Sequence, residues 1–92
     1  MEQVHVYITG MVQGVGFRQF VRRNAKKLGL LGWVRNTDDN KVEAVFSGEH
    51  EVIEKMIGIC KTGPFMSEVK SVDVKLQDAE VFPVEDFAIL TT

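Results

Sequence analysis

The fold is decided by residues 4–28, VHVYITGMVQGVGFRQFVRRNAKKL, in which the spacing of the apolar residues changes partway along. Val4, Val6 and Ile8 alternate with more polar residues, which predicts a strand with one apolar face. Three glycines within residues 10–16 then indicate a loop. Apolar residues recur after the loop at helical spacing: Phe17, Phe20, Val21, Ala25 and Leu28. The stretch therefore predicts a strand, a glycine-rich loop and an amphipathic helix.

The rest of the chain continues this alternation of strands and helices. In chain order, we expect a strand over 31–37, a turn at 38–40, a strand over 41–47, a helix beginning within 48–51 and ending at 62–64, a strand over 69–76, a loop over 78–83 and a short strand around 87–89. Two helices with one apolar stripe each can bury those stripes only against one face of an antiparallel sheet. The order β-α-β-β-α-β, with a short C-terminal fifth strand, therefore predicts an α+β, ferredoxin-like sandwich in a single domain over residues 1–92.

Charge and composition exclude several classes of function. Eleven Lys and Arg residues against thirteen Asp and Glu residues leave a net charge of -2, whereas a general nucleic-acid binder needs a basic excess. The chain has no run of about 18 apolar residues and no secretion signal at its start. A single cysteine, Cys60, cannot form an intramolecular disulfide or a multi-cysteine metal site. We therefore expect a soluble cytoplasmic domain that binds neither nucleic acid nor a membrane.

The glycine loop is a candidate anion site. It lies between a strand and a helix, where free backbone N–H groups gather at the positive end of the helix dipole. Arg18, the first charged residue after the loop, would add a planar fork of donors that suits phosphate oxygens. A phosphate-binding P-loop is excluded because Phe17 and Arg18 follow Gly16, and Gln19 stands where a dinucleotide fingerprint needs a glycine. The spacing alone also fits a tight crossover with Arg18 in solvent.

Two longer motifs point to a family. Residues 10–18, GMVQGVGFR, resemble one signature of the acylphosphatases. Residues 32–37, GWVRNT, with the acidic turn and Val42-Glu43 after them, resemble the second signature of that family. The resemblance covers nearly the whole chain and implies a ferredoxin-like fold.

The resemblance also implies an activity and a set of site residues. The activity is hydrolysis of a small acyl phosphate to a carboxylate and inorganic phosphate. Since no metal-ligand cluster is apparent, we expect catalysis without a metal or cofactor, and we expect a monomer. Arg18 and the loop amides would hold the phosphate, and Asn36 would hold the attacking water. The loop residues concerned are Val12, Gln13, Gly14, Val15, Gly16 and Phe17. Two positions depart from the family pattern. Met11 stands where members of the family commonly have a basic residue, and Asn40 stands where they commonly have glycine.

Two other interpretations of the whole chain remain open at this stage. One is a non-catalytic anion-binding or interaction module of the same fold, which activity on a small acyl phosphate would distinguish. The other is a domain of a larger carbamoyl-transfer maturation protein, which carries a similar module. The ends of the chain, Met1 and Thr92, favour a free-standing enzyme.

Other chemistry-bearing residues have simpler interpretations. Cys60 lies on the apolar stripe of the second predicted helix, which favours a core residue over a phosphoenzyme nucleophile. His5 and His50 lack a ligand cluster for a metal, and we expect His5 on the less apolar face of the sheet. Tyr7 and Trp33 could stack on RNA bases, but the aromatic consensus of RNA-binding strands is absent.

Overall fold

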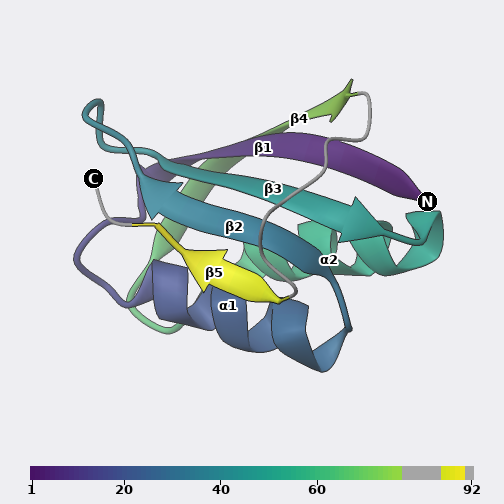
Figure 1. Ribbon diagram of the computed structural model, residues 1–92. Coiled ribbons are helices and arrows are strands. Elements are labelled where there is room, and N and C mark those ends of the chain that lie inside the picture. The colour runs from purple at the N-terminus through teal and green to yellow at the C-terminus, as the bar shows by residue number, and fades with distance from the viewer. Residues whose placement is uncertain (78–85, 91–92) are drawn as a thin grey trace.

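The computed structural model describes residues 1–77 and 86–90. Its elements in chain order are β1 (Glu2–Met11), α1 (Phe17–Lys27), β2 (Leu31–Asn36), β3 (Val42–Gly48), α2 (His50–Thr62), β4 (Glu68–Gln77) and β5 (Phe87–Ile89). The strands form one sheet in the order β4-β1-β3-β2-β5, and both helices lie on one side of it (Figure 1). The predicted ferredoxin-like sandwich is therefore confirmed. The predicted loop over 78–83 lies outside the described residues.

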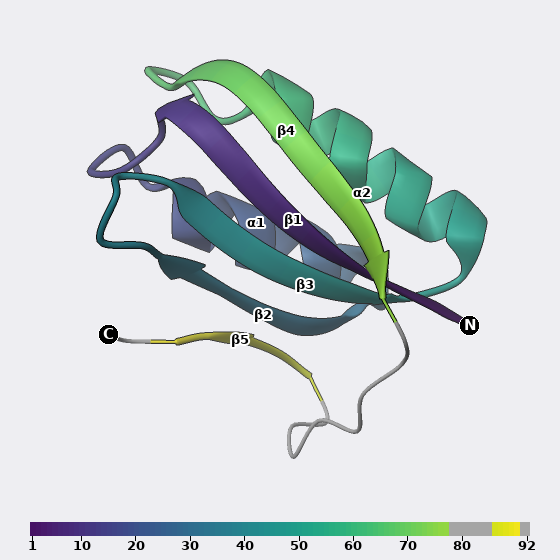
Figure 2. The same cartoon turned by 90° about the horizontal axis from the view of Figure 1, so that it is seen from above.

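The sheet is mixed, whereas the sequence pattern indicated a wholly antiparallel one. The pairs β1–β3, β1–β4 and β2–β3 are antiparallel, but β5 pairs with β2 in parallel, with Trp33 opposite Ala88. Figure 2 shows β5 as a short strand at the edge of the sheet beside β2. The fifth strand thereby brings the C-terminal part of the chain next to the strand that carries Asn36.

The core lies between the sheet and the two helices. Val4, Val6 and Ile8 of β1 are buried, which confirms the apolar face predicted from their alternation. The helices contribute the stripes expected from their spacing: Phe17, Val21 and Ala25 from α1, and Ile53, Met56, Ile57 and Cys60 from α2. Phe46 of β3 stacks on Phe87 of β5, with 5.6 Å between the ring centroids. The buried residues of α1 hold the N-terminus of that helix against the sheet.

Strand β1 is longer than predicted, because it continues through Gly10 and Met11. These residues pair with Val69 and Glu68 of β4 across a β-bulge. At Gly10, φ is 134°, and a Cβ there would lie 2.1 Å from the carbonyl oxygen of Glu68. Only glycine fits so close to the neighbouring backbone. The glycine-rich loop is consequently shorter than expected and covers residues 12–16.

The hairpin between β2 and β3 has the predicted tight turn. Asn40 has a φ of 66°, the left-handed conformation that asparagine tolerates. The amide of Thr37 donates to the carbonyl of Lys41 at 2.9 Å, and the amide of Lys41 donates to the Thr37 hydroxyl at 3.0 Å. Thr37 and Lys41 thus close the turn rather than ending the strands, and Asn36 is the last residue of β2.

A buried carboxylate lies on the sheet face away from the helices, where we expected His5. Glu43 of β3 is only 4% exposed. It accepts hydrogen bonds from Arg35 Nε at 2.6 Å and Tyr7 Oη at 3.1 Å, and its Oε2 lies 2.5 Å from His5 Nε2. Burial by itself would raise the pKa of Glu43, but the contacts with Arg35, His5 and Tyr7 together lower it below its ordinary value.

The lowered pKa makes the stability contribution of Glu43 dependent on pH. Replacement by glutamine, E43Q, should lower the free energy of unfolding by about 2 kcal/mol at pH 7, because the charge-assisted hydrogen bonds are lost. Because folding lowers the pKa of Glu43, its carboxylate stabilises the folded protein fully at pH values above its ordinary pKa of 4.5. This stabilisation is lost as the pH falls through the lower pKa of the folded protein. Urea unfolding of both proteins between pH 7 and pH 3 should therefore converge in acid. A difference that does not change with pH would contradict this account.

Candidate active site

The loop over residues 12–16 presents the uncapped start of α1. Gly14 and Gly16 have φ values of 76° and 77°, so both adopt the left-handed conformation that glycine reaches without strain. Gly16 is the N-cap of α1, and no side chain caps the helix there. Successive amides in such a turn, together with the helix dipole, form a site that favours an anion.

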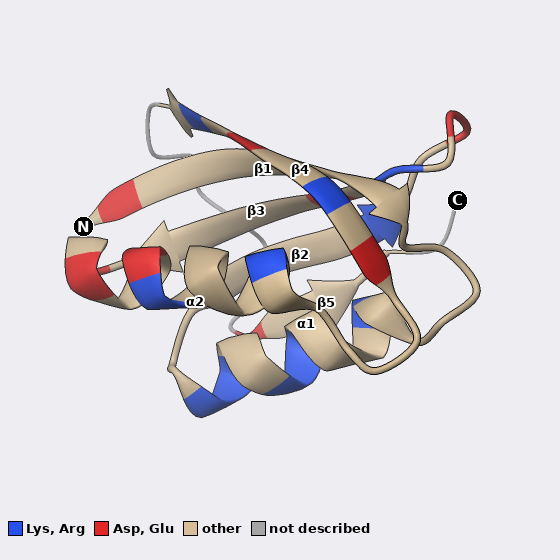
Figure 3. Ribbon diagram, turned by 180° about the vertical axis from the view of Figure 1, so that it is seen from behind, with Lys and Arg blue, Asp and Glu red and all other residues tan. Residues whose placement is uncertain are grey.

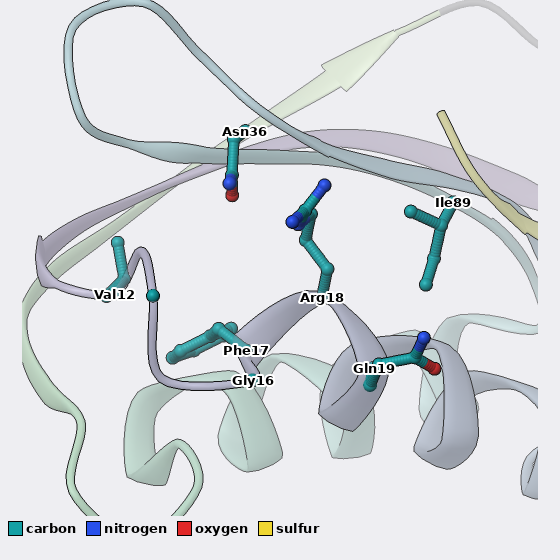
Figure 4. A pocket seen from close by; sticks show the side chains of 8 residues that line it. Val12, Gly16, Phe17, Arg18, Gln19, Asn36 and Ile89 are labelled. Carbon is teal, nitrogen blue, oxygen red and sulfur yellow. The ribbon is translucent and has the colours of Figure 1, made fainter. Parts of the chain in front are cut away.

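A small cavity of about 180 Å³ lies at this junction. Its lining residues are Val12, Gly14, Gly16, Phe17, Arg18, Gln19, Asn36 and Ile89. Figure 4 shows the side chain of Arg18 rising from α1 and that of Asn36 descending from β2 into the same space. The cavity is smaller than the roughly 300–1,000 Å³ pockets that enclose drug-sized ligands, so it suits a small anion or one end of a larger molecule.

Asn36 carries an unsatisfied acceptor. Its Oδ1 is buried, and no donor for it is present among residues 1–77 and 86–90. Buried polar atoms in folded proteins nearly always have a hydrogen-bond partner. The free acceptor therefore makes the side chain of Asn36 a candidate to accept a hydrogen bond from a bound donor, such as water.

The charges on α1 favour an anion at its N-terminus. The helix carries no acidic residue, and its basic residues are Arg18, Arg22, Arg23, Lys26 and Lys27. Figure 3 shows blue Lys and Arg segments along α1, whereas red Asp and Glu segments appear at the start of α2. Lys26 pairs with Asp86 at 3.1 Å. The net charge of -2 is thus unevenly distributed, since the charged residues of α1 are all basic and one of them, Arg18, lines the cavity.

The structure brings most of the predicted site residues together. Arg18 and Asn36, which are far apart in sequence, line one cavity, as do Val12, Gly14, Gly16 and Phe17. The side chain of Gln13 points elsewhere, since its Nε2 donates to carbonyl oxygens of the β2–β3 turn. Val15 packs against the hydrophobic core. For both residues, only the backbone amide is left as a candidate ligand.

Two lining residues were not predicted. Gln19 immediately follows Arg18 in the first turn of α1, so its nearness to the loop was a usable signal. Ile89 reaches the cavity through the parallel pairing of β5 with β2, in which it lies opposite Val34. No local pattern around residue 89 indicates that pairing.

The structure gives no support for a nucleophilic cysteine or a metal. Cys60 is buried in the core, and burial raises the pKa of its thiol to about 12. Within the described part of the chain, no three metal-ligating side chains form a group that could hold an ion. Neither does any described helix have the length and apolar character needed to cross a membrane.

The buried thiol of Cys60 should resist modification in the folded protein. At pH 8 we expect an aromatic disulfide reagent to react with it at least ~10³-fold more slowly than in denaturant, because reaction requires the core to open. The measurement is the absorbance of released thiolate against denaturant concentration. Rapid labelling under native conditions, with circular dichroism unchanged, would show that Cys60 is accessible after all.

The fold and the cavity together define a ferredoxin-like α+β protein with a candidate anion site at the N-terminus of its first helix. The Acylphosphatase family model matches residues 4–89. The chain is 48% identical over 75 residues to an acylphosphatase of Roseiflexus sp. (strain RS-1), a match that covers 82% of this chain and 81% of that protein. The chain therefore belongs to the acylphosphatase family, as its motifs predicted.

Solved structures agree with this assignment. The acylphosphatase from Bacillus subtilis superposes with a TM-score of 0.93 at 34% identity, over 99% of this chain and all of that one, 100%. HypF from T. kodakarensis superposes with a TM-score of 0.84 at 32% identity, over 100% of this chain but only 12% of that chain. The same module thus occurs as most of a small protein and as a minor part of a larger one.

Proposed function

We propose that this acylphosphatase hydrolyses its substrate in the cavity between the loop over 12–17, Arg18 and Asn36. The single observation that carries this assignment is that the Arg18 and Asn36 side chains enter one small cavity from opposite elements. The loop amides and Arg18 would hold the phosphoryl group, and Asn36 would orient the water that attacks it. The substrate is an acyl phosphate, with its carboxyl side directed out of the cavity.

The phosphate ligands supply most of the catalysis that such a reaction needs. Phosphoryl transfer depends on positioning and on neutralising the charge of the equatorial oxygens. The left-handed turns at Gly14 and Gly16, together with the uncapped α1 N-terminus, supply fixed N–H donors. Arg18 supplies the positive charge and a fork of donors that can bind two oxygens at once.

Asn36 suits the role of holding water because its amide is neutral. Its buried Oδ1 lacks a donor within the described residues, and a water O–H could supply one. A carboxylate in the same place would also accept from water, but it would repel the dianionic phosphate. We therefore assign orientation of the water, rather than deprotonation, to Asn36.

The leaving group explains why the cavity needs no strong acid. The water oxygen forms a bond to phosphorus while the bond from phosphorus to the acyl oxygen breaks, and the electron pair leaves on the carboxylate. A carboxylic acid has a pKa of about 4, so this group departs without a proton. The lining residues described above include no Asp, Glu or His, and we assign the proton of the water to a phosphate oxygen.

A steady-state assay with benzoyl phosphate and EDTA tests the proposed function. We expect turnover in the presence of the chelator and competitive inhibition by inorganic phosphate, which would occupy the same donors. Phosphate binding without turnover would favour the alternative of a non-catalytic anion-binding module. Activity that disappears with EDTA and returns with a divalent metal would contradict the assignment of charge neutralisation to Arg18 and the amides.

Replacement of Arg18 should be the most damaging single change. R18A would leave a dianion facing neutral donors, and loss of one preorganised donor typically costs about 10²–10³ in kcat. R18K should not restore activity, because an ammonium cannot reproduce the fork. The matched control is R23A, which removes an equal charge from the exposed side of the same helix and should keep kcat near wild type. Normal turnover and phosphate affinity in folded R18A would refute the assignment.

Replacement of Asn36 should separate chemistry from binding. N36A should reduce kcat by ~10²-fold or more, because the water loses its orientation, while the Kd for inorganic phosphate changes only a few-fold. N36D should lose activity and also bind phosphate more weakly, because it adds an anion to the cavity. Kinetics corrected for the folded fraction, with phosphate titrations on the same samples, measure both effects. If Asn36 only terminates β2, both variants would instead lower Tm and leave kcat of the folded protein unchanged.

A further inference from the structure

The side chain of Gln13 joins the loop over residues 12–16 to the β2–β3 turn. Its Nε2 donates to the carbonyl oxygen of Thr37 at 2.8 Å and to that of Lys41 at 2.9 Å. A glutamine Nε2 carries two hydrogens, so these bonds use both. Thr37 directly follows Asn36, and Lys41 pairs with Thr37 across the turn. A residue of the loop is thereby bonded to both ends of the turn that follows Asn36.

The sheet itself provides no direct bond between these two regions. The loop follows β1, and Asn36 ends β2, but β3 lies between β1 and β2 in the sheet. Backbone pairing therefore connects the loop to β2 only through β3. Both regions lie at the end of the sheet where the β2–β3 turn leaves it. The two bonds from Gln13 connect the loop and the turn in one step. No other hydrogen bond described above joins the loop directly to the turn.

We propose that Gln13 is a positioning residue that sets the distance and direction between the phosphate site and the Asn36 amide. The inference rests on the proposed function, in which Arg18 and the loop amides hold phosphorus and Asn36 holds the water. An in-line attack requires these two groups to keep one relative geometry, and a misplacement of about 1 Å can cost 10²-fold in rate. Gln13 does this without touching the substrate through its side chain.

A double-mutant cycle of Gln13 and Asn36 tests this role. Q13M preserves the length and neutrality of the side chain but removes both donors, whereas glutamate would also add a charge near the phosphate. We expect Q13M to lower kcat by about 10- to 100-fold, while the Kd for inorganic phosphate stays within about 3-fold, because Arg18 and the amides remain. In an N36A background, Q13M should lower kcat by less than about 2-fold, since the water is already unpositioned.

A matched control isolates the effect of position from a general loss of stability. S67A removes a similar side-chain-to-backbone hydrogen bond, from Ser67 Oγ to the carbonyl of Pro64 at 2.7 Å, in the loop after α2. It should lower Tm without changing kcat. If Q13M folds poorly, Q13N, which keeps the amide but shortens its reach by one methylene, is measured in its place with the same expectations.

The possible failures are distinguishable. If Q13M lowers kcat by the same factor with and without N36A, the positioning role is wrong. It is also wrong if Q13M lowers phosphate affinity as much as kcat. Either result would leave the proposed function intact. A lowered Tm with wild-type kcat would reduce Gln13 to a structural residue. Wild-type kcat in N36A alone would contradict the water assignment in the proposed function and, with it, the role of Gln13.

Discussion

The N-terminus of α1 and the last residue of β2 border one cavity, and the packing of α1 on the sheet keeps them together. Phe17, Val21 and Ala25 bury one side of α1 against the sheet, so the start of that helix cannot move away from Asn36. The left-handed conformations of Gly14 and Gly16 shape the loop that borders this cavity. Arg18 and Asn36 complete a site that no single element contains. In the proposed function, the activity of the family depends on this junction, and the core supports it.

The open face of the sheet supports the same junction from the other side. Arg35 precedes Asn36 in β2 and bonds to the buried Glu43, which also contacts His5 and Tyr7 of β1. These contacts tie β1, β3 and β2 together across the face that no helix covers. Since β1 leads into the loop over 12–16 and β2 ends at Asn36, the cluster links the two strands that lead to the cavity.

Local patterns in the sequence predicted most of the fold. What they did not predict depends on two pairings between strands that are far apart in the sequence. Alternation in β1 and the stripes of α1 and α2 identified the elements and the layer arrangement, because burial requires one side of each element. Strand β1 extended past Gly10 because β4 accepts a bulge there, and β5 paired in parallel with β2. Neither pairing leaves a periodic signal in the sequence. For the candidate site, the motifs singled out Arg18 and Asn36, which line one cavity, but the side-chain bonds of Gln13 depend on where the turn after Asn36 lies in space.

In the proposed mechanism, water beside Asn36 attacks the phosphorus atom held by Arg18 and the loop. Hydrolysis of benzoyl phosphate in water enriched with oxygen-18 tests it most directly, because the label reports which bond breaks. We expect one labelled oxygen in the inorganic phosphate and none in the benzoate, measured by mass spectrometry under single-turnover conditions. Label in the benzoate would place the attack at the acyl carbon. That result would contradict the assignment of the cavity as a phosphoryl-transfer site.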